Sequence, residues 1–260
     1  MIKQIRKIAV GAAKLAGGML KKEYEKFDRK QVMLKSHHEI LTKCDLMSQE
    51  IIINELKKYF PDYGIVSEER TAEKNYSEYT WYLDPIDGTT NFSMHNPLWS
   101  ISLALAKRDE LVFGLVYAPM LEEVYLAAMG QGAELNGRKI SVSKIFQGKV
   151  LNTFCHGARD ADIKKALAYW RRQKLNELDC RQMGSAAIEL SYVAAGRVES
   201  FVAPGMHDWD VAAGALLVRE AGGKVTDFSG RDWRLGVAEA EIAASNGKAH
   251  TQILKAIRGK

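Results

Sequence analysis

The sequence contains little cysteine and no long apolar run. Its three cysteines, Cys44, Cys155 and Cys180, show no CxxC spacing, and an odd number without a secretory signal predicts free thiols in a reducing compartment. No stretch approaches the roughly 18 consecutive apolar residues of a membrane span. The N-terminal run is interrupted by Lys14 and Lys21, as in an amphipathic helix rather than a signal peptide. We therefore expect a cytoplasmic protein that does not enter a membrane.

The chain also lacks a large excess of charge of either sign. The chain has 37 Lys and Arg against 32 Asp and Glu, which leaves a net charge of +5. This small positive surplus favours small anionic substrates. Nucleic-acid binding is the less favoured alternative, because no block of Lys and Arg carries interleaved aromatic residues. Within that alternative, the partner would be RNA or a transcription complex. The histidines have no zinc-ligand spacing, and His37-His38 is typical of a solvent-exposed pair.

What is present predicts a globular chain of the α/β (α+β) class. Hydrophobic residues make up 47% and charged residues 27%, which is ordinary for a folded domain. No linker, low-complexity tract or internal repeat is visible. We therefore expect one unit over residues 1–260 with two layered halves, an α+β half over about 1–145 and an α/β half over about 146–260.

Hydrophobic periodicity places the elements along the chain. In the first half, helices are expected at 5–19 and 42–60, a short strand at 80–83, and an antiparallel sheet with strands at 98–106, 111–117 and 123–128. The segment 30–43 is expected to be irregular or a hairpin, and Asn136-Gly137 is typical of a hairpin turn. In the second half, strands are expected at 151–154, 178–182, 198–202 and 241–244, and helices at 160–171, 185–195, 209–220 and 247–257.

The segment Asp84-Pro85-Ile86-Asp87-Gly88-Thr89-Thr90-Asn91-Phe92 carries the most chemical information. The strand at 80–83 delivers Asp84 to its end, and Asp87 follows three residues later. Gly88 then permits a tight turn, after which Thr89 and Thr90 can cap a helix. Such paired carboxylates can hold a hard cation, and the N–H groups of the helix start can hold a phosphate. For a lone DxxDG pattern, an ordinary Asx turn is the simpler interpretation.

Further acids lie where predicted elements begin or end. They are Asp45, Glu68, Glu69, Asp208 and Asp210. If these acids converge, each pair of carboxylates about 4 Å apart repels by about 4 kcal/mol at an effective dielectric near 20. A divalent cation would remove that repulsion, and an all-oxygen donor set suits Mg²⁺ rather than zinc.

Together with several other motifs, these residues resemble the inositol monophosphatases, within the Mg²⁺-dependent, lithium-sensitive sugar phosphatase superfamily. The resemblance covers nearly the whole chain and rests on Val32–Ser36, Thr42–Asp45, Ser67–Glu69, Asp84–Phe92, Gly130–Ala133, Asn136-Gly137, Gly184–Ala187, Trp209–Gly214 and Glu220–Gly223. It implies a layered αβαβα sandwich, often a homodimer, that hydrolyses inositol 1-phosphate or a similar small sugar phosphate with metal-activated water. A covalent nucleophile is not needed for such chemistry, and the sequence has no GxSxG elbow.

The resemblance also implies roles for individual residues, with most of the metal site in the first half. Two or three Mg²⁺ ions would be held by Glu68, Asp84, the carbonyl of Ile86, Asp87 and Asp210. Catalysis would use Asp45 and Thr89 to orient and deprotonate the attacking water, with Glu68 beside a third ion. Substrate contacts would come from Gly88, Thr89, Gly184, Ser185, Ala186 and Asp210.

One position departs from the pattern of the family. Where the family carries a Glu that hydrogen-bonds inositol hydroxyls, seven residues before Asp210, this chain has Ala203. A site without that partner loses discrimination. The alternatives are therefore a fructose-1,6-bisphosphatase or a 3′(2′),5′-bisphosphate nucleotidase or NADP phosphatase of the same fold, although the unbroken Asp87–Phe92 run favours the inositol phosphatase branch. Asp208 would either replace the missing Glu or cap its helix.

Overall fold

The computed structural model describes residues 1–34, 40–69, 77–145, 148, 150–237 and 240–259. Its helices are α1 (Ile2–Tyr24), α2 (Lys43–Tyr59), α3 (Thr89–Ser93), α4 (Asp160–Leu175), α5 (Ala186–Ala194), α6 (Asp208–Glu220) and α7 (His250–Arg258). Within these described ranges, no helix combines the length and the apolar character needed to cross a membrane. The three cysteines are free thiols, as predicted.

The strands form two main sheets. The larger sheet contains, in spatial order, β3 (Gly64–Ser67), β4 (Tyr79–Asp87), β5 (Ser100–Lys107), β6 (Glu110–Ala118), β7 (Glu123–Ala128), β8 (Gly132–Leu135) and β9 (Arg138–Ile140). The smaller sheet contains, in spatial order, β11 (Asp179–Arg181), β10 (Leu151–Phe154), β12 (Ser200–Met206), β14 (Ala240–Ser245) and β13 (Lys224–Thr226). A short antiparallel pair, β1 (Met33–Leu34) and β2 (Ile40–Leu41), precedes α2.

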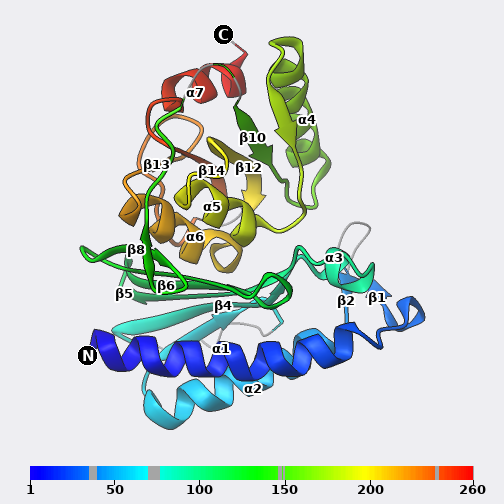
Figure 1. The fold of residues 1–260 in the computed structure, drawn as a ribbon, viewed down its shortest axis with the longest axis vertical. Coiled ribbons are helices and arrows are strands. Elements are labelled where there is room, and N and C mark those ends of the chain that lie inside the picture. Colours follow the sequence, from blue (N-terminus) through cyan, green and yellow to red (C-terminus); the bar gives the residue numbers. More distant parts are fainter. Residues whose placement is uncertain (35–39, 70–76, 146–147, 149, 238–239, 260) are drawn as a thin grey trace.

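Helices and sheets alternate in layers (Figure 1). Helices α1 and α2 cover one face of the larger sheet, where Leu20 and Leu56 belong to a core that also contains Trp81. Helices α5 and α6 lie between the two sheets in a second core, and α4 and α7 pack on the outer face of the smaller sheet around a third. The order helix, sheet, helix, sheet, helix confirms the predicted αβαβα sandwich. The predicted division near residue 145 stays a prediction.

The strand pairing explains why the periodicity differs between the halves. In the larger sheet β4 to β9 pair antiparallel and only β3 joins in parallel, so the antiparallel prediction for this region is confirmed. In the smaller sheet β10 pairs in parallel with β11 and β12, whereas β14 pairs antiparallel with β12 and β13. Helix α4 connects β10 to β11 and helix α5 connects β11 to β12, which produces the alternation of strands and helices seen in the sequence.

Two local predictions need correction, and one strand was not predicted. The strand expected at 80–83 runs on as β4 to Asp87, with an irregularity in its pairing between Asp84 and Asp87. Thr89 and Thr90 do not cap α3, because the N-cap is Gly88 and it makes no side-chain cap. The short strand β13 was not predicted, since three residues carry no readable period. The pair His37-His38 lies outside the described residues.

Candidate active site

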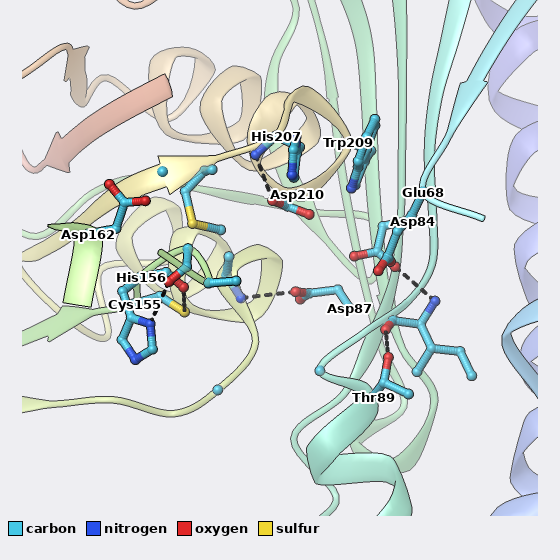
Figure 2. A pocket seen from close by; sticks show the side chains of 18 of the residues that line it. Glu68, Asp84, Asp87, Thr89, Cys155, His156, Asp162, His207, Trp209 and Asp210 are labelled. Carbon is cyan, nitrogen blue, oxygen red and sulfur yellow. Dashed lines mark hydrogen bonds between the residues drawn. The ribbon is translucent and has the colours of Figure 1, made fainter. Parts of the chain in front are cut away.

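A pocket of about 580 Å³ opens where β4 ends and helices α5 and α6 begin. Figure 2 shows Glu68, Asp84 and Asp87 on one side of it, with His156 and Asp162 on the other. The lining residues from the first half are Glu68, Asp84, Ile86, Asp87, Gly88 and Thr89. Those from the second half include Cys155, His156, Arg159, Asp162, Gly184, Ala186, Trp209 and Asp210. Residues from both parts of the sequence therefore line one pocket.

The end of β4 brings two acids to the pocket. Pro85 has no N–H and cannot donate to a neighbouring strand, and the pairing with β5 is irregular from Asp84 to Asp87. The backbone N–H of Ile86 donates to Asp84 Oδ1 at 2.9 Å, and the Ser48 hydroxyl of α2 donates to the Pro85 carbonyl at 2.9 Å. These bonds hold the irregular turn, so that both carboxylates reach the pocket.

Asp87 joins the larger sheet to the start of α5. Its Oδ1 accepts the N–H of Ala186 at 3.1 Å, and its Oδ2 accepts the N–H of Ala187 at 3.0 Å. The Ser185 hydroxyl also donates to Oδ2. Because the first N–H groups of a helix have no partner within it, a carboxylate there satisfies them and interacts favourably with the helix dipole.

Two other acids occupy equivalent places on their own helices. Asp45 is the third residue of α2 and accepts the N–H of Thr42 at 2.8 Å, and Asp210 is the third residue of α6 and accepts the N–H of His207 at 2.8 Å. Both arrangements are capping boxes. The starts of α2, α5 and α6 thus each hold one acid of this site, and the positive ends of these helices partly offset the crowded negative charge.

Thr89 connects the pocket to the buried Asp45. Its hydroxyl lies 3.1 Å from Asp45 Oδ1 and 3.0 Å from the carbonyl oxygen of Ile86, within donating distance of both. Asp45 is fully buried and receives a further bond of 2.7 Å from the Thr42 hydroxyl. A pocket-lining hydroxyl is therefore coupled to a carboxylate that does not line the pocket.

Two glycines allow the backbone to approach closely here. Gly88 has φ +90°, and a Cβ at this position would lie 2.9 Å from the carbonyl oxygen of Gly184. Gly184 has φ +81° and faces the amide of Asn91, whose nitrogen donates to the carbonyls of Leu98 and Met183. The Gly88 and Gly184 turns therefore lie directly against each other, and both line the pocket.

Burial raises the pKa values of three of the acids, Asp84, Asp87 and Asp45. Burial, followed by the charges of Glu68, Asp87, Asp210 and Asp45, raises the pKa of Asp84 well above its usual range. Burial also raises the pKa of Asp87 to about 6, against the opposing effect of its hydrogen bonds. The pKa of Asp45 rises to about 6 for the same reason. Ionising this cluster without a counter-charge therefore opposes folding.

The donor chemistry of the cluster fits Mg²⁺. We call Glu68, Asp84, Asp87 and Asp210 the acidic wall of the pocket. Every side-chain donor in this wall is oxygen, and a cation would relieve the mutual repulsion of these acids. Among the described residues, no group of three His, Cys, Asp or Glu side chains is arranged to hold a metal ion by itself. Mg²⁺ does not need such a cage, because it usually keeps several waters and takes one or two carboxylates with phosphate oxygens from the substrate.

Most residues singled out in the sequence meet at this pocket. Glu68, Asp84, Ile86, Asp87, Gly88, Thr89, Gly184, Ala186 and Asp210 line it. Asp45 and Ser185 lie behind the surface, bonded to Thr89 and Asp87 respectively. Asp208 neither lines the pocket nor caps its helix, because it accepts the N–H of Gly236 at 2.9 Å. Ala203 is fully buried in the core between the sheets.

Several residues that line or support the pocket are not marked by any pattern in the sequence. His156, Arg159 and Asp162 belong to the loop after β10 and the first turn of α4, and no motif marks them. Glu189 of α5 is fully buried and accepts the N–H groups of Met183 and Gly184 at 3.1 and 3.2 Å. It supports the Gly184 turn from behind, which only the fold reveals.

Comparison with known proteins agrees with this geometry. The chain matches the inositol monophosphatase family over residues 1–260. It is 40% identical over 226 residues to the Nus factor SuhB of Pasteurella multocida, covering 86% of this chain and 85% of that protein. It is 38% identical over 219 residues to a fructose-1,6-bisphosphatase/inositol-1-monophosphatase of Thermotoga maritima, covering 84% and 82%. The crystal structure of the extragenic suppressor protein suhB from Bartonella henselae superposes with a TM-score of 0.90 at 32% identity, covering 98% of each chain.

Proposed function

The chain belongs to the inositol monophosphatase family, and from this premise we propose that it is a Mg²⁺-dependent phosphomonoesterase acting on inositol 1-phosphate or a similar small sugar phosphate. The observation that carries the proposal is the gathering of Glu68, Asp84, Asp87 and Asp210, from distant parts of the sequence, in one pocket beside Thr89. Buried acids with raised pKa values, as at Asp84 and Asp87, are typical of functional sites.

Magnesium would be held by Glu68, Asp84, Asp87, Asp210 and the carbonyl of Ile86, with water and substrate oxygens completing each coordination shell. When bound, it would neutralise phosphate charge and make water a better nucleophile at neutral pH. Two or three ions are expected.

The protein's own groups would orient the reactants. Thr89 would accept the proton of the attacking water while passing its own toward Asp45, to which it is already hydrogen-bonded. The backbone N–H groups of Gly88 and Thr89 would contact the phosphate. Gly184 and Ala186 would line the alcohol side, and Ser185 would act from behind by fixing Asp87.

Phosphate release from inositol 1-phosphate tests the proposal. Release should require Mg²⁺, stop in excess chelator and fall below detection in Asp87→Asn. Asp109→Asn, which changes an exposed acid in the turn between β5 and β6, is the matched control and should retain full activity. Turnover that survives chelation or the Asp87→Asn change would overturn the assignment. Sedimentation of the same sample tests the homodimer that the family resemblance implies.

A binding role is the second candidate. One relative is named as a Nus factor, and the net charge of +5 permits contact with RNA or a transcription complex. RNA affinity that falls steeply with salt would support this role. Absence of gel retardation at low salt would reject RNA binding.

A further inference from the structure

Glu189 is a buried carboxyl that the proposed chemistry leaves unused. It lies in the first turn of α5, and its side chain is not accessible to solvent. Burial raises its pKa to about 8, so the group is mostly protonated at pH 7. A carboxyl in such a place lowers stability relative to a well-packed apolar side chain. Sacrifices of this kind are expected mainly at functional sites, and the hydrogen bonds of Glu189 lead to the pocket.

These bonds hold the turn that precedes the helix of Glu189. Its Oε1 accepts the N–H of Met183 at 3.1 Å and the N–H of Gly184 at 3.2 Å. The side-chain nitrogen of Asn91 donates to the carbonyl of Met183 at 2.8 Å. Gly184 lines the pocket, on the side where the proposed function places the alcohol part of the substrate. Glu189 and Asn91 therefore fix this part of the pocket through both the N–H and the carbonyl groups of one turn.

A second carboxylate holds the following residues of the chain. Asp87 accepts the N–H groups of Ala186 and Ala187 at 3.1 and 3.0 Å. Glu189 and Asp87 thus hold the two ends of segment 183–187. Asp87 lines the pocket and is a proposed metal ligand, whereas Glu189 does not line it. The end of the segment that Glu189 holds is therefore fixed independently of any cation that Asp87 binds.

The Gly184 turn also determines how closely Gly88 can pack. A Cβ on Gly88 would lie 2.9 Å from the carbonyl oxygen of Gly184 and 3.3 Å from the Cβ of Ser185, so the two turns are in contact. The proposed function assigns phosphate contacts to the N–H groups of Gly88 and Thr89. A shift of the Gly184 turn would therefore displace the leaving group relative to the phosphate. A misplacement of about 1 Å can slow a reaction about 10²-fold.

We propose that Glu189 is a positioning residue for phosphate ester hydrolysis, which fixes the Gly184 turn against Gly88 and so aligns the leaving group with the metal site. This inference rests on the proposed phosphatase function and extends it to a residue that touches neither substrate nor metal. The effect depends on an oxygen that accepts two N–H bonds, and the acidic proton is not needed. An amide at position 189 should therefore replace the carboxyl.

Substitutions at position 189 separate the two bonds from the bulk of the side chain. Glu189→Leu keeps a similar size but accepts no bond, whereas Glu189→Gln keeps the accepting oxygen. With inositol 1-phosphate and saturating Mg²⁺, Glu189→Leu should lower kcat by about ten- to a hundredfold, with a smaller change in KM, and Glu189→Gln should stay within about threefold of wild type. The Mg²⁺ concentration that gives half the maximal rate should change by less than about threefold in both variants, because Asp87 keeps its own bonds.

Glu199→Leu is the matched control for the loss of a buried carboxylate. Glu199 is also buried and accepts the N–H of Leu151 at 2.7 Å, but it does not line this pocket. Its replacement should lower the free energy of unfolding in urea and leave kcat unchanged when rates are compared per mole of folded protein. Glu189→Met provides a second apolar replacement, whose flexible side chain adapts to the site should Glu189→Leu fail to fold.

The outcomes distinguish this inference from the proposed function. A wild-type kcat in the apolar variants at position 189, or a loss in Glu189→Gln as large as theirs, would overturn the role of Glu189 alone. A loss of kcat in Glu199→Leu as large as in Glu189→Leu would do the same, since it would reduce the effect to general destabilisation. Absence of phosphate release by the wild-type protein would overturn the phosphatase assignment itself.

Discussion

The hydroxyl of Thr89 lies 3.1 Å from the carboxylate of Asp45, across a sequence separation of 44 residues. Asp45 is fixed by Thr42 at the start of α2, whereas Thr89 begins α3 and lines the pocket. Helix α2 packs on one face of the larger sheet and β4 delivers Thr89 from that sheet. The layered fold therefore sets this contact before any substrate arrives.

Removing the Thr89 hydroxyl should slow chemistry more than binding. We expect Thr89→Ala to lower kcat by about 10²- to 10⁴-fold, the usual contribution of a positioned proton-transfer group, with KM nearly unchanged. Thr89→Ser keeps the hydroxyl and should retain most of the rate. Steady-state kinetics with inositol 1-phosphate provide the measurement, and equal rates for the two variants would contradict the role of the hydroxyl.

Gly88 should not tolerate a side chain. Gly88→Ala places a Cβ 2.9 and 3.1 Å from two carbonyl oxygens at φ +90°, whereas Gly222→Ala, at φ +87°, meets nothing within 4 Å. We expect Gly222→Ala to cost about 1–2 kcal/mol in free energy of unfolding from backbone strain alone. Gly88→Ala should cost at least about 1 kcal/mol more and abolish phosphate release. Urea denaturation compares the two, and similar values would show that the close approach is unimportant.

Glu189 should make stability depend on pH. Burial raises its pKa to about 8, far above the usual value near 4.3 for an unfolded chain. Between these values the folded state binds a proton that the unfolded state has lost, so stability falls as pH rises from about 5 to about 8. The neutral Glu189→Gln should therefore gain stability relative to wild type over this range. A difference in free energy of unfolding that stays constant with pH would contradict the raised pKa.

Magnesium should stabilise the protein increasingly as pH rises. Burial raises the pKa values of Asp45 and Asp87 to about 6. Without a cation, both carboxyls are therefore mostly protonated at pH 5, and their ionisation at higher pH lowers the stability of the folded state. A cation binds the ionised form, so the rise in Tm on replacing chelator with Mg²⁺ should be larger at pH 7.5 than at pH 5. A rise in Tm that does not change with pH would mean that the ionisation of these acids is not coupled to binding of the ion.

The sequence allowed the acidic wall of the pocket to be predicted, but not the opposite wall. Asp84 and Asp87 stand in a run whose turn chemistry is readable locally, and Asp45 and Asp210 lie in the first turns of helices that the hydrophobic pattern predicts. The contact of Gly88 with Gly184, by contrast, depends on how two sheets stack, which local periodicity does not encode. Arg159 and Asp162 look like an ordinary i,i+3 pair on a helix until the fold places them across the pocket.

The motif Gly130-Gln131-Gly132 shows a different limit. It supported the family resemblance, yet its glycine N–H groups donate to the Glu220 carboxylate at 2.8 Å, and none of these residues lines the pocket. Its role in this fold is to join the β7–β8 turn to the end of α6. A motif can therefore identify a family without belonging to its site.

Calorimetric titration of the metal-free protein with Mg²⁺, in wild type and Asp84→Asn, tests the central claim most directly, because Asp84 is buried among the other acids of the wall. We predict saturable binding by wild type and by the exposed control Asp109→Asn, and affinity at least about tenfold lower in Asp84→Asn. Binding that is absent in wild type, or equal in Asp84→Asn, would contradict the claim that these carboxylates share magnesium.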